Sequence, residues 1–457
     1  MTRIGIGMHW LVAPLVGCLG MAADPAASQE IASRDMAARH DALDADTAVR
    51  MALETDPRLA AMELEAAAGR AEAAFGGRWE NPSLAVEWEE FGLARPMWRR
   101  SELTVLLEQP IPLGEAGAAE RQLAATRAAR TESRRRLARV SLAVQVREAH
   151  LAALAEQERI DLLVESLAVA GQVRDAVRAA IDAGSSAPAD EHLATAEYRA
   201  EELARRRAEA RLAMRKEHLA AFWGAEGDCI GRLVGSLDPP GPSAPVRPST
   251  LDPEAALALV PGAALMRERR AALELEQARR IPDLTLIGGV RGIEGFGEQA
   301  FVAGLSVPLP AWNRNRAGIE AAALQVRRAA ALVRMEEREW RRQIGELEAA
   351  IHQARLDHDG IRDGVLPELE AGFKATLEAF RGGDASSLDV LDAQRRVLAV
   401  RIQMLDSAEQ LLAARIRLDS LLLQSGAAIP RNDSDATAGS TPTRDAPSTA
   451  PSPEEGR

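Results

Sequence analysis

The sequence has few aromatic residues, few cysteines and no long apolar run after its first 23 residues. Only 3 % of its 457 residues are aromatic, and one is a tyrosine. This composition disfavours a conventional globular core and favours long helices that pack through small side chains. The two cysteines cannot build a disulfide framework. Beyond residue 23, no stretch approaches the roughly 20 apolar residues that a membrane-spanning helix needs.

The sequence also lacks a basic surface and a recognisable catalytic or metal-binding motif. A formal net charge of −12 argues against a nucleic-acid-binding protein, which usually has a basic face. The seven histidines are scattered, and His352 and His358 are six residues apart, which does not place them on one helical face. We therefore expect no bound metal and no cofactor. No nucleophile constellation or pair of acids stands out, so we do not expect an enzyme.

Residues 1–23 are typical of a secretory signal, with Arg3 followed by a mostly apolar run. Two cleavage sites are open. Met21-Ala22-Ala23 suits an ordinary signal peptidase, whereas Leu15-Val16-Gly17-Cys18 resembles a lipobox, which would make Cys18 a lipid-bearing N-terminus. The mature chain then begins with a polar leader that extends to residue 42.

A β-hairpin followed by a very long helix is predicted twice. Alternating apolar residues predict strands at about 82–110 and again at about 282–308, and each pair leads to a Pro-x-Pro segment. The landmarks recur at a nearly constant interval: Pro82 and Pro282 are 200 residues apart, and Pro110 and Pro308 are 198 apart. The chain is therefore predicted to be a tandem duplication.

Each hairpin leads into an alanine-rich helix. The first is predicted from about Glu115 to Ala183, which corresponds to roughly 100 Å at ~1.5 Å per residue. The second is predicted from Ala317 to about Arg381, and Pro367 should kink it or remove one of its backbone hydrogen bonds.

Two matching turns follow these helices, each with a glycine and, six residues later, an aspartate. They contain Gly184 and Asp190 in the first repeat, and Gly383 and Asp389 in the second. Glycine is the usual residue at a helix C-terminus, and aspartate is a good N-cap for the returning helix. Capping alone is therefore one complete explanation for these four residues.

The predicted fold is mainly α with a small β part, in a tandem-repeat helical barrel. Four strands cannot close a barrel, and open sheet edges cannot lie in lipid. Three copies would supply twelve strands, an even number that suits an outer-membrane β-barrel. The predicted divisions are a signal peptide (1–23), a polar leader (24–42), repeat one (43–235), a proline-rich linker (236–250), repeat two (251–425) and a disordered tail (426–457).

The ordered set of segments resembles the TolC-type outer-membrane efflux factors, over about residues 43–425. The segments that carry the resemblance are Val307–Arg316, Val365–Glu368 and Gly383–Gln394, in the same order and spacing. The turn Trp312-Asn-Arg-Asn315 is most similar to the heavy-metal branch of that family, of the cobalt–zinc–cadmium type.

The resemblance implies a homotrimeric exit duct in outer-membrane lipid, with a long periplasmic helical part, in a Gram-negative-type envelope. It would receive heavy-metal cations, or alternatively organic compounds, from an inner-membrane pump and a periplasmic adaptor. Gly184, Asp190, Gly383 and Asp389 would form the periplasmic tip that docks the adaptor. Asp384 and Asp389 would be candidates for the residues that close the aperture.

Two other classes of protein share part of this pattern. A periplasmic adaptor also has a signal peptide, a helical hairpin and β-structure, but the duplicated strand hairpins argue against it. A soluble coiled-coil scaffold would explain the helices, but neither the alternating strands nor the signal peptide.

Overall fold

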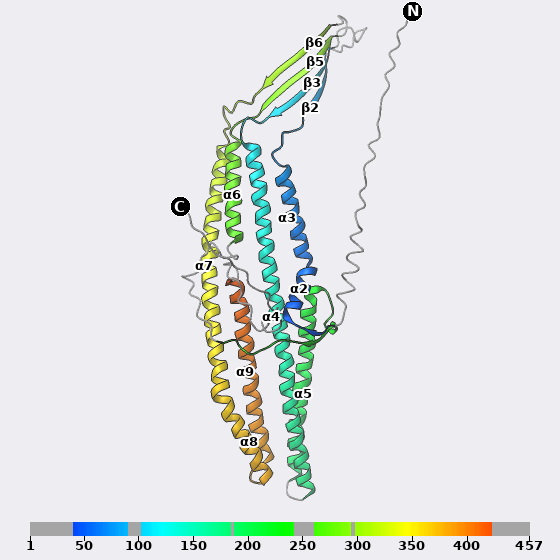
Figure 1. The fold of residues 1–457 in the computed structure, drawn as a ribbon, viewed down its shortest axis with the longest axis vertical. Helices are drawn as coiled ribbons and strands as arrows, with labels where there is room; N and C mark the ends of the chain where they lie inside the picture. The colour runs from blue at the N-terminus through cyan, green and yellow to red at the C-terminus, as the bar shows by residue number, and fades with distance from the viewer. Residues whose placement is uncertain (1–39, 90–101, 184–186, 242–259, 294–297, 423–457) are drawn as a thin grey trace, which may run out of the picture.

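The computed structural model describes residues 40–89, 102–183, 187–241, 260–293 and 298–422. The predicted signal peptide, Cys18, Gly184 and the predicted tail lie outside these residues. The described part is an elongated layer of long helices with a four-stranded sheet at one end (Figure 1). None of the described helices is both long enough and apolar enough to cross a membrane.

The first half of the chain contains the longest unbroken helix. Asp44 precedes its first short helix and accepts a hydrogen bond from the Thr47 N–H at 2.8 Å, and Asp56 accepts from the Arg58 N–H at 2.7 Å. These carboxylates satisfy backbone donors that have no partner within their helices. The elements are β1 (His40–Leu43), α2 (Ala45–Thr55), α3 (Pro57–Phe75), β2 (Ser83–Glu89), β3 (Glu102–Ile111), α4 (Ala116–Asp182), α5 (Pro188–Ala220), two 3-10 turns (Ala221–Trp223 and Gly227–Cys229) and β4 (Ile230–Leu233).

The second half repeats the order of hairpin, descending helix and returning helix. Its descending helix runs from Arg316 to Gly382 and has the same length as α4, but it is interrupted by a π-helical turn. The elements are α6 (Val260–Ala278), β5 (Leu284–Ile293), β6 (Glu298–Ser306), α7 (Arg316–Gly360), the π-turn (Ile361–Val365), α8 (Leu366–Gly382) and α9 (Ser387–Leu422).

The π-turn ends two residues before the proline that the sequence predicts as a kink. Pro367 is the second residue of α8. Proline offers no N–H to the carbonyl four residues earlier and its ring clashes with that carbonyl. A wider turn just before the proline relieves this clash, and π-turns are a common way of doing so. The helix bends at this point (Figure 1).

The helices form a single curved layer with α4 at its centre. Next to the sheet the order across the layer is α3–α4–α6–α7, and at the far end α4 contacts α5 and α9, with α8 packed on α9 (Figure 1). Small side chains allow the close approach: Ala170 and Ala194 are buried between the lower helices together with Val173, Val177 and Val390.

The largest buried cluster surrounds a parallel strand pair at mid-height. β1 and β4 pair with Ala42 opposite Arg232, and Trp223 packs with the neighbouring helices. His150 of α4 is buried there, with its Nε2 3.0 Å from the Leu43 carbonyl oxygen, and burial lowers its pKa. The sequence predicts neither strand, because each has four residues and they are separated by almost 190.

The order of the strands repeats the order of the helices. The sheet is antiparallel with the order β2–β3–β5–β6. α3 leads into β2, β3 leads into α4, α6 leads into β5, and β6 leads into α7. Each strand therefore continues one helix of the upper layer, and sheet and layer form one continuous wall (Figure 1). β3 continues through Pro110, which pairs with Thr285; this proline is tolerated because β2 no longer pairs with β3 there.

Candidate functional site

One face of the sheet is apolar and exposed across all four strands. Val86, Val105, Val290 and Phe301 are paired in register, so their side chains form one row on the same face. Phe301 is 92 % exposed and Val86 61 %. A neighbouring row begins with Leu84 and Leu107 and is equally open to solvent. A sheet that exposes its apolar face requires an apolar environment outside the single chain.

The opposite face carries charged side chains on β2, β3 and β5 together with apolar ones such as Leu106 and Ile287, and it is partly covered. Arg291 of β5 lies 3.3 Å from the carboxylate of Glu102 and donates a hydrogen bond from Nε to the Thr104 hydroxyl at 3.1 Å. Thr104 is only 1 % exposed. The other carboxylates on this face of β2 and β3 lie at alternate positions, and they are Glu87, Glu89 and Glu108. The distribution of polarity is the reverse of that in a soluble sheet packed on a core.

Both outer edges of the sheet are unpaired within the described residues. β2 and β6 each have one neighbour, so one row of backbone groups on each faces outward. Such edges are not stable in lipid unless another chain pairs with them. The sheet is therefore structurally incomplete as one chain.

Each repeat has a tightly constrained backbone position where the sheet and the helices meet. In repeat one, Gly77 has φ of +61°, and a Cβ there would lie 1.9 Å from the Gly117 carbonyl oxygen. In repeat two, Asn315 adopts φ of +54° and its Nδ2 donates to the Glu276 carbonyl oxygen at 2.9 Å. Asparagine tolerates this left-handed conformation better than most residues. The need for a left-handed conformation at this position explains why residue 315, in the turn that carries part of the family resemblance, is an asparagine.

The second-repeat turn lies at the end of the layer opposite the sheet. Gly383 ends α8 with φ of +89°, as the sequence predicts for a glycine C-cap. Its N–H donates to the Phe380 carbonyl at 3.1 Å, and the Asp384 N–H donates to the Ala379 carbonyl at 2.9 Å. These two bonds form a Schellman motif, which needs a left-handed residue at this position. The side chain of Asp384 is exposed.

The two turn aspartates are not N-caps, which corrects the expectation from the sequence. α5 begins at Pro188 and α9 at Ser387, so Asp190 and Asp389 are third residues of their helices. Proline suits a first helical position, which moves the start of α5 ahead of Asp190. Asp190 instead accepts from the Ala187 N–H at 3.2 Å.

Asp389 has a fuller set of partners than Asp190. Its carboxylate accepts from the Ser386 N–H at 2.9 Å and from the Ser386 hydroxyl at 2.7 Å, which together lower the pKa of Asp389. The Asp389 N–H donates back to the hydroxyl at 3.3 Å. This is a reciprocal capping box. In repeat one, the residue that corresponds to Ser386 is Ala187, which has no hydroxyl to accept a hydrogen bond from the Asp190 N–H.

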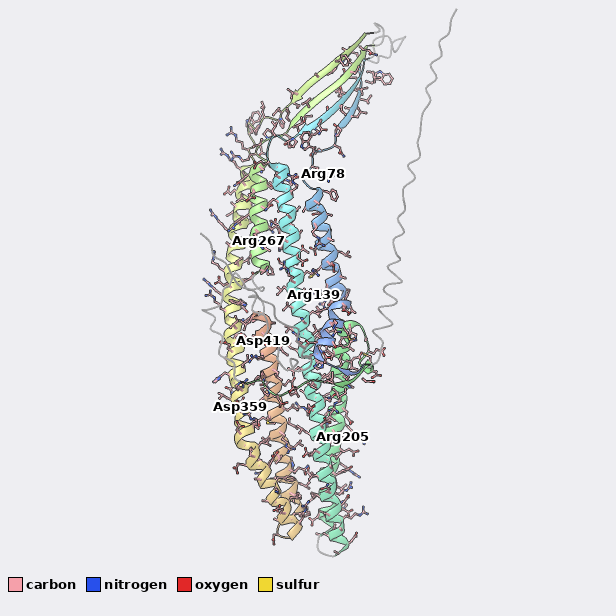
Figure 2. The ribbon with its side chains drawn as sticks, in the orientation of Figure 1. Arg78, Arg139, Arg205, Arg267, Asp359 and Asp419 are labelled. Atoms are coloured by element: carbon pink, nitrogen blue, oxygen red, sulfur yellow. The ribbon has the colours of Figure 1, made fainter. Side chains whose placement is uncertain are left out.

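Ion pairs and one buried amide join the two repeats along α9. Arg401 contacts Glu165 of α4 at 2.9 Å and Glu370 of α8 at 2.6 Å. Gln394 donates to the Ser166 carbonyl and hydroxyl from a buried position. These contacts cannot be predicted from the sequence, because the helices carry many charged residues and the sequence does not show which of them pair. Charged side chains such as Arg139, Arg205 and Asp359 occur along the whole layer (Figure 2).

The described residues contain no cluster of three or more histidine, cysteine or acidic side chains able to hold a metal ion. What the geometry provides is a helical layer continuous with a sheet that has one exposed apolar face, one face with charged side chains and two unpaired edges.

Comparison with known proteins identifies the class of protein that this wall belongs to. A family model for outer membrane efflux proteins matches residues 48–225 and 255–422, so the chain belongs to the outer membrane efflux protein family. The two matched segments each contain one long descending helix and its hairpin. The resemblance predicted from the sequence is confirmed. This is a family of efflux proteins and not of enzymes.

Among individual relatives, the cobalt-zinc-cadmium resistance protein CzcC of Cupriavidus metallidurans is 29 % identical over 312 residues, which cover 67 % of this chain and 73 % of that protein. The nickel and cobalt resistance protein CnrC of the same organism is 27 % identical over 300 residues, 63 % of this chain and 68 % of that protein. The chain is thus similar to heavy-metal members of the family.

Solved structures show the same fold. CusC superposes with a TM-score of 0.67 at 16 % identity, over 83 % of this chain and 91 % of that one. A membrane protein from Pseudomonas aeruginosa gives 0.67 at 20 % identity, over 83 % and 90 % of the two chains. The predicted fold class, mainly α with a small β part, is confirmed.

Proposed function

We propose that this protein is the outer-membrane exit duct of a tripartite efflux system and that it conducts heavy-metal cations passively to the exterior. The observation that supports this most is the sheet with an exposed apolar face, continuous with a helical wall, in a chain of the outer membrane efflux protein family. The apolar face would contact lipid and the polar face would line water.

Three copies would complete the structure that one chain leaves open. The free edge of β2 in one copy would pair with the free edge of β6 in the next, and the edge helices α3 and α7 would meet below them. Twelve strands would then close a barrel with no unpaired edge, which lipid requires. The helical layers would close into a tunnel continuous with the barrel.

The charge on the inner wall suits cations. The polar face of β2 and β3 carries four glutamates, at positions 87, 89, 102 and 108, and Arg291 neutralises Glu102. A channel lined by carboxylates raises the local concentration of cations without binding them tightly. The heavy-metal resistance named for CzcC and CnrC favours metals over organic compounds, which remain the second candidate cargo.

We further propose that the turn around Gly383 and Asp389, together with Asp190 and Gly184 of repeat one, forms the periplasmic tip that docks an adaptor attached to an inner-membrane pump. Asp384 and Asp389 are the candidates for closing its aperture. The position of the Gly383 turn at the end opposite the sheet supports this assignment (Figure 1).

The test is a deletion of the gene, followed by growth in graded cobalt, zinc, cadmium and nickel and in a panel of organic toxicants. We expect increased sensitivity to one or more of the metals, restored by the wild-type gene, with unchanged tolerance of the organic compounds. Sensitivity only to organic compounds would favour the second candidate cargo. Recovery of the protein as a soluble monomer would contradict the duct itself.

A further inference from the structure

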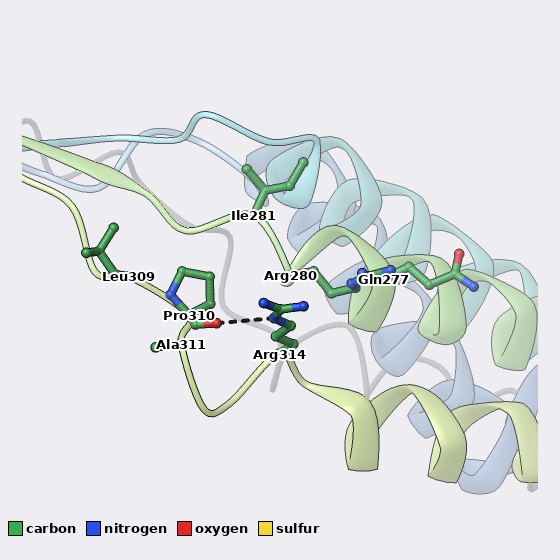
Figure 3. A pocket seen from close by; sticks show the side chains of 7 residues that line it. All are labelled: Gln277, Arg280, Ile281, Leu309, Pro310, Ala311 and Arg314. Atoms are coloured by element: carbon green, nitrogen blue, oxygen red, sulfur yellow. Dashed lines mark hydrogen bonds between the residues drawn. The ribbon is translucent and has the colours of Figure 1, made fainter.

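A pocket of about 630 Å³ lies at the junction between the sheet and the helices of repeat two (Figure 3). It is formed where α6 leads into β5 and where β6 leads into α7. Its volume lies within the range of roughly 300–1,000 Å³ that is usual for small-ligand sites. The lining residues are Gln277, Arg280, Ile281, Leu309, Pro310, Ala311 and Arg314.

The pocket is cationic on the side of the helices. Arg280 and Arg314 approach it from two different segments, and no carboxylate is among the lining residues (Figure 3). Within the described residues, neither arginine forms an ion pair, whereas the neighbouring Arg279 pairs with Glu276 at 2.9 Å. Two uncompensated guanidinium groups at one pocket favour an anionic ligand.

One of these arginines is held in place by the backbone of the pocket. Arg314 donates from Nε to the Pro310 carbonyl oxygen at 3.4 Å. This contact uses one edge of the guanidinium and leaves its terminal nitrogens without a hydrogen bond among the described residues. Terminal guanidinium nitrogens are the donors that bind phosphate oxygens in a bidentate manner.

The pocket is apolar on the side of the sheet. Ile281 and Leu309 line it and are 50 % and 82 % exposed. Leu309 follows Leu305 and Val307 at alternate positions, so the exposed apolar residues continue from β6 to the pocket. Trp312, two residues before Arg314, is 98 % exposed. An exposed tryptophan beside arginines, at the limit of an apolar surface, is typical of a membrane–water interface.

From this gradient of polarity we infer that the junction pocket binds the phosphate-containing headgroup of an anionic phospholipid from the membrane leaflet nearest the helices. The phosphate lies between Arg280 and Arg314, and the acyl chains lie along Leu309 and the apolar face of the sheet. This inference rests on the proposed position of the sheet in a membrane. It adds a specific lipid contact that fixes the depth at which the duct sits.

The test compares two double variants with equal change in charge. Arg280→Gln with Arg314→Gln removes both cationic groups of the pocket. Arg334→Gln with Arg338→Gln removes two exposed arginines of α7 that form no ion pair among the described residues. Arg334 lies about 30 Å along the chain from Arg314, at ~1.5 Å per residue. Each protein is purified from membranes in mild detergent, and its co-purifying phospholipids are identified and counted by mass spectrometry.

We expect the wild type and the Arg334/Arg338 variant to retain phosphatidylglycerol or cardiolipin. The Arg280/Arg314 variant should bind these lipids about 25-fold more weakly, because each basic residue near an anionic lipid surface contributes roughly a factor of five in affinity. In a second arm, delipidated protein is heated with phosphatidylcholine vesicles, with vesicles that also contain phosphatidylglycerol, or with inorganic phosphate. Only the vesicles with phosphatidylglycerol should raise its melting temperature, and only when the pocket arginines are present.

Three results would overturn the inference. Equal lipid retention by all three proteins would show that the arginines bind no lipid. Stabilisation by inorganic phosphate to the same extent would indicate a free-anion site. Loss of the assembled oligomer in the Arg280/Arg314 variant alone, with lipid retention unchanged per chain, would mean that a second copy of this chain covers the pocket. Failure of the protein to enter membranes at all would instead contradict the proposed function.

Discussion

The descending helices of the two repeats have the same length but different continuity. α4 runs from Ala116 to Asp182 without a break, whereas the corresponding stretch from Arg316 to Gly382 is divided into α7, a π-turn and α8. The lower part of α4 buries Val173 and Val177 against its neighbours. α8, at the same height, has no buried residue.

From this difference we expect the two halves of the wall to have different mechanical roles. α4 contacts α3, α6, α5 and α9 and is the central support of the layer. α8 packs mainly on α9, and the π-turn before Pro367 provides a bend above it. Segments with few buried contacts open most easily, so the lower end of repeat two is expected to be the more mobile of the two.

The most disruptive test is to place a proline in α4 at the position equivalent to Pro367. Leu167→Pro should destabilise the protein by about 3 kcal/mol or more, because it removes a backbone hydrogen bond and its ring clashes with the preceding turn. Thermal unfolding followed by circular dichroism, together with the fraction of assembled oligomer, measures the effect.

Two matched substitutions complete this test. Leu167→Ala should cost only about 1–2 kcal/mol, since it shortens a half-buried side chain and leaves the helix intact. Pro367→Leu should not destabilise the protein, since it restores an N–H to a helix that has already adapted to its absence. If Leu167→Pro and Leu167→Ala have equal effects, α4 is not the continuous support that its packing indicates.

The second test concerns the turn at the end of α8. Gly383→Ala should cost about 1–2 kcal/mol, because a residue with a Cβ is strained at positive φ. Gly383→Trp adds bulk at an exposed position, so it should assemble as well as the alanine variant but lose metal resistance and cross-linking to the adaptor. Normal resistance and cross-linking in the tryptophan variant would show that the turn is only a helix cap.

A smaller effect is expected from the two capping boxes. Ser386→Ala should destabilise the protein by about 1 kcal/mol, because it removes the hydroxyl that accepts a hydrogen bond from the Asp389 N–H. Ala187→Ser supplies the missing hydroxyl in repeat one and should stabilise by about 0.5–1 kcal/mol. Chemical denaturation of the purified oligomer compares the two. The two substitutions should change the free energy of unfolding in opposite directions. A stabilising effect of Ser386→Ala would contradict the capping box formed by Ser386 and Asp389.

The smallest effect is a pH dependence at the contact between the repeats. Glu409 of α9 is half-buried, and burial raises its pKa, although Arg215 and Arg159 oppose this while Asp406 and Glu156 add to it. A carboxyl group with a raised folded-state pKa contributes stability that is fully present below the unfolded pKa of about 4.3 and is lost as pH rises through the folded value.

Glu409→Gln should therefore melt higher than the wild type at pH 8, and the difference should disappear towards pH 4. Solvent screening keeps the effect small. Melting curves at a series of pH values measure it. A variant that is less stable than the wild type at pH 8 would show that the attraction of Arg215 and Arg159 for the Glu409 carboxylate outweighs the cost of its burial.

Periodic features of this fold can be predicted from the sequence. The apolar alternation predicts the strands, the proline spacing predicts the duplication, and Gly383 predicts a left-handed helix end. Contacts between distant segments cannot be predicted in this way: the β3–β5 pairing and the short β1–β4 pair depend on how the repeats pack. The role of Asp190 is missed because Pro188 begins the helix two residues earlier.

The central claim is that one face of the sheet contacts lipid and the other contacts water. Single cysteines at positions 102 to 108 of β3, in a Cys229→Ala background, can be spin-labelled in the reconstituted protein. The accessibility of each label to oxygen, which concentrates in lipid, is then compared with its accessibility to a water-soluble nickel chelate. Labels at 103, 105 and 107 should favour oxygen, and labels at 102, 104, 106 and 108 should favour the chelate. The same accessibility at all positions, or the reverse alternation, would contradict the account.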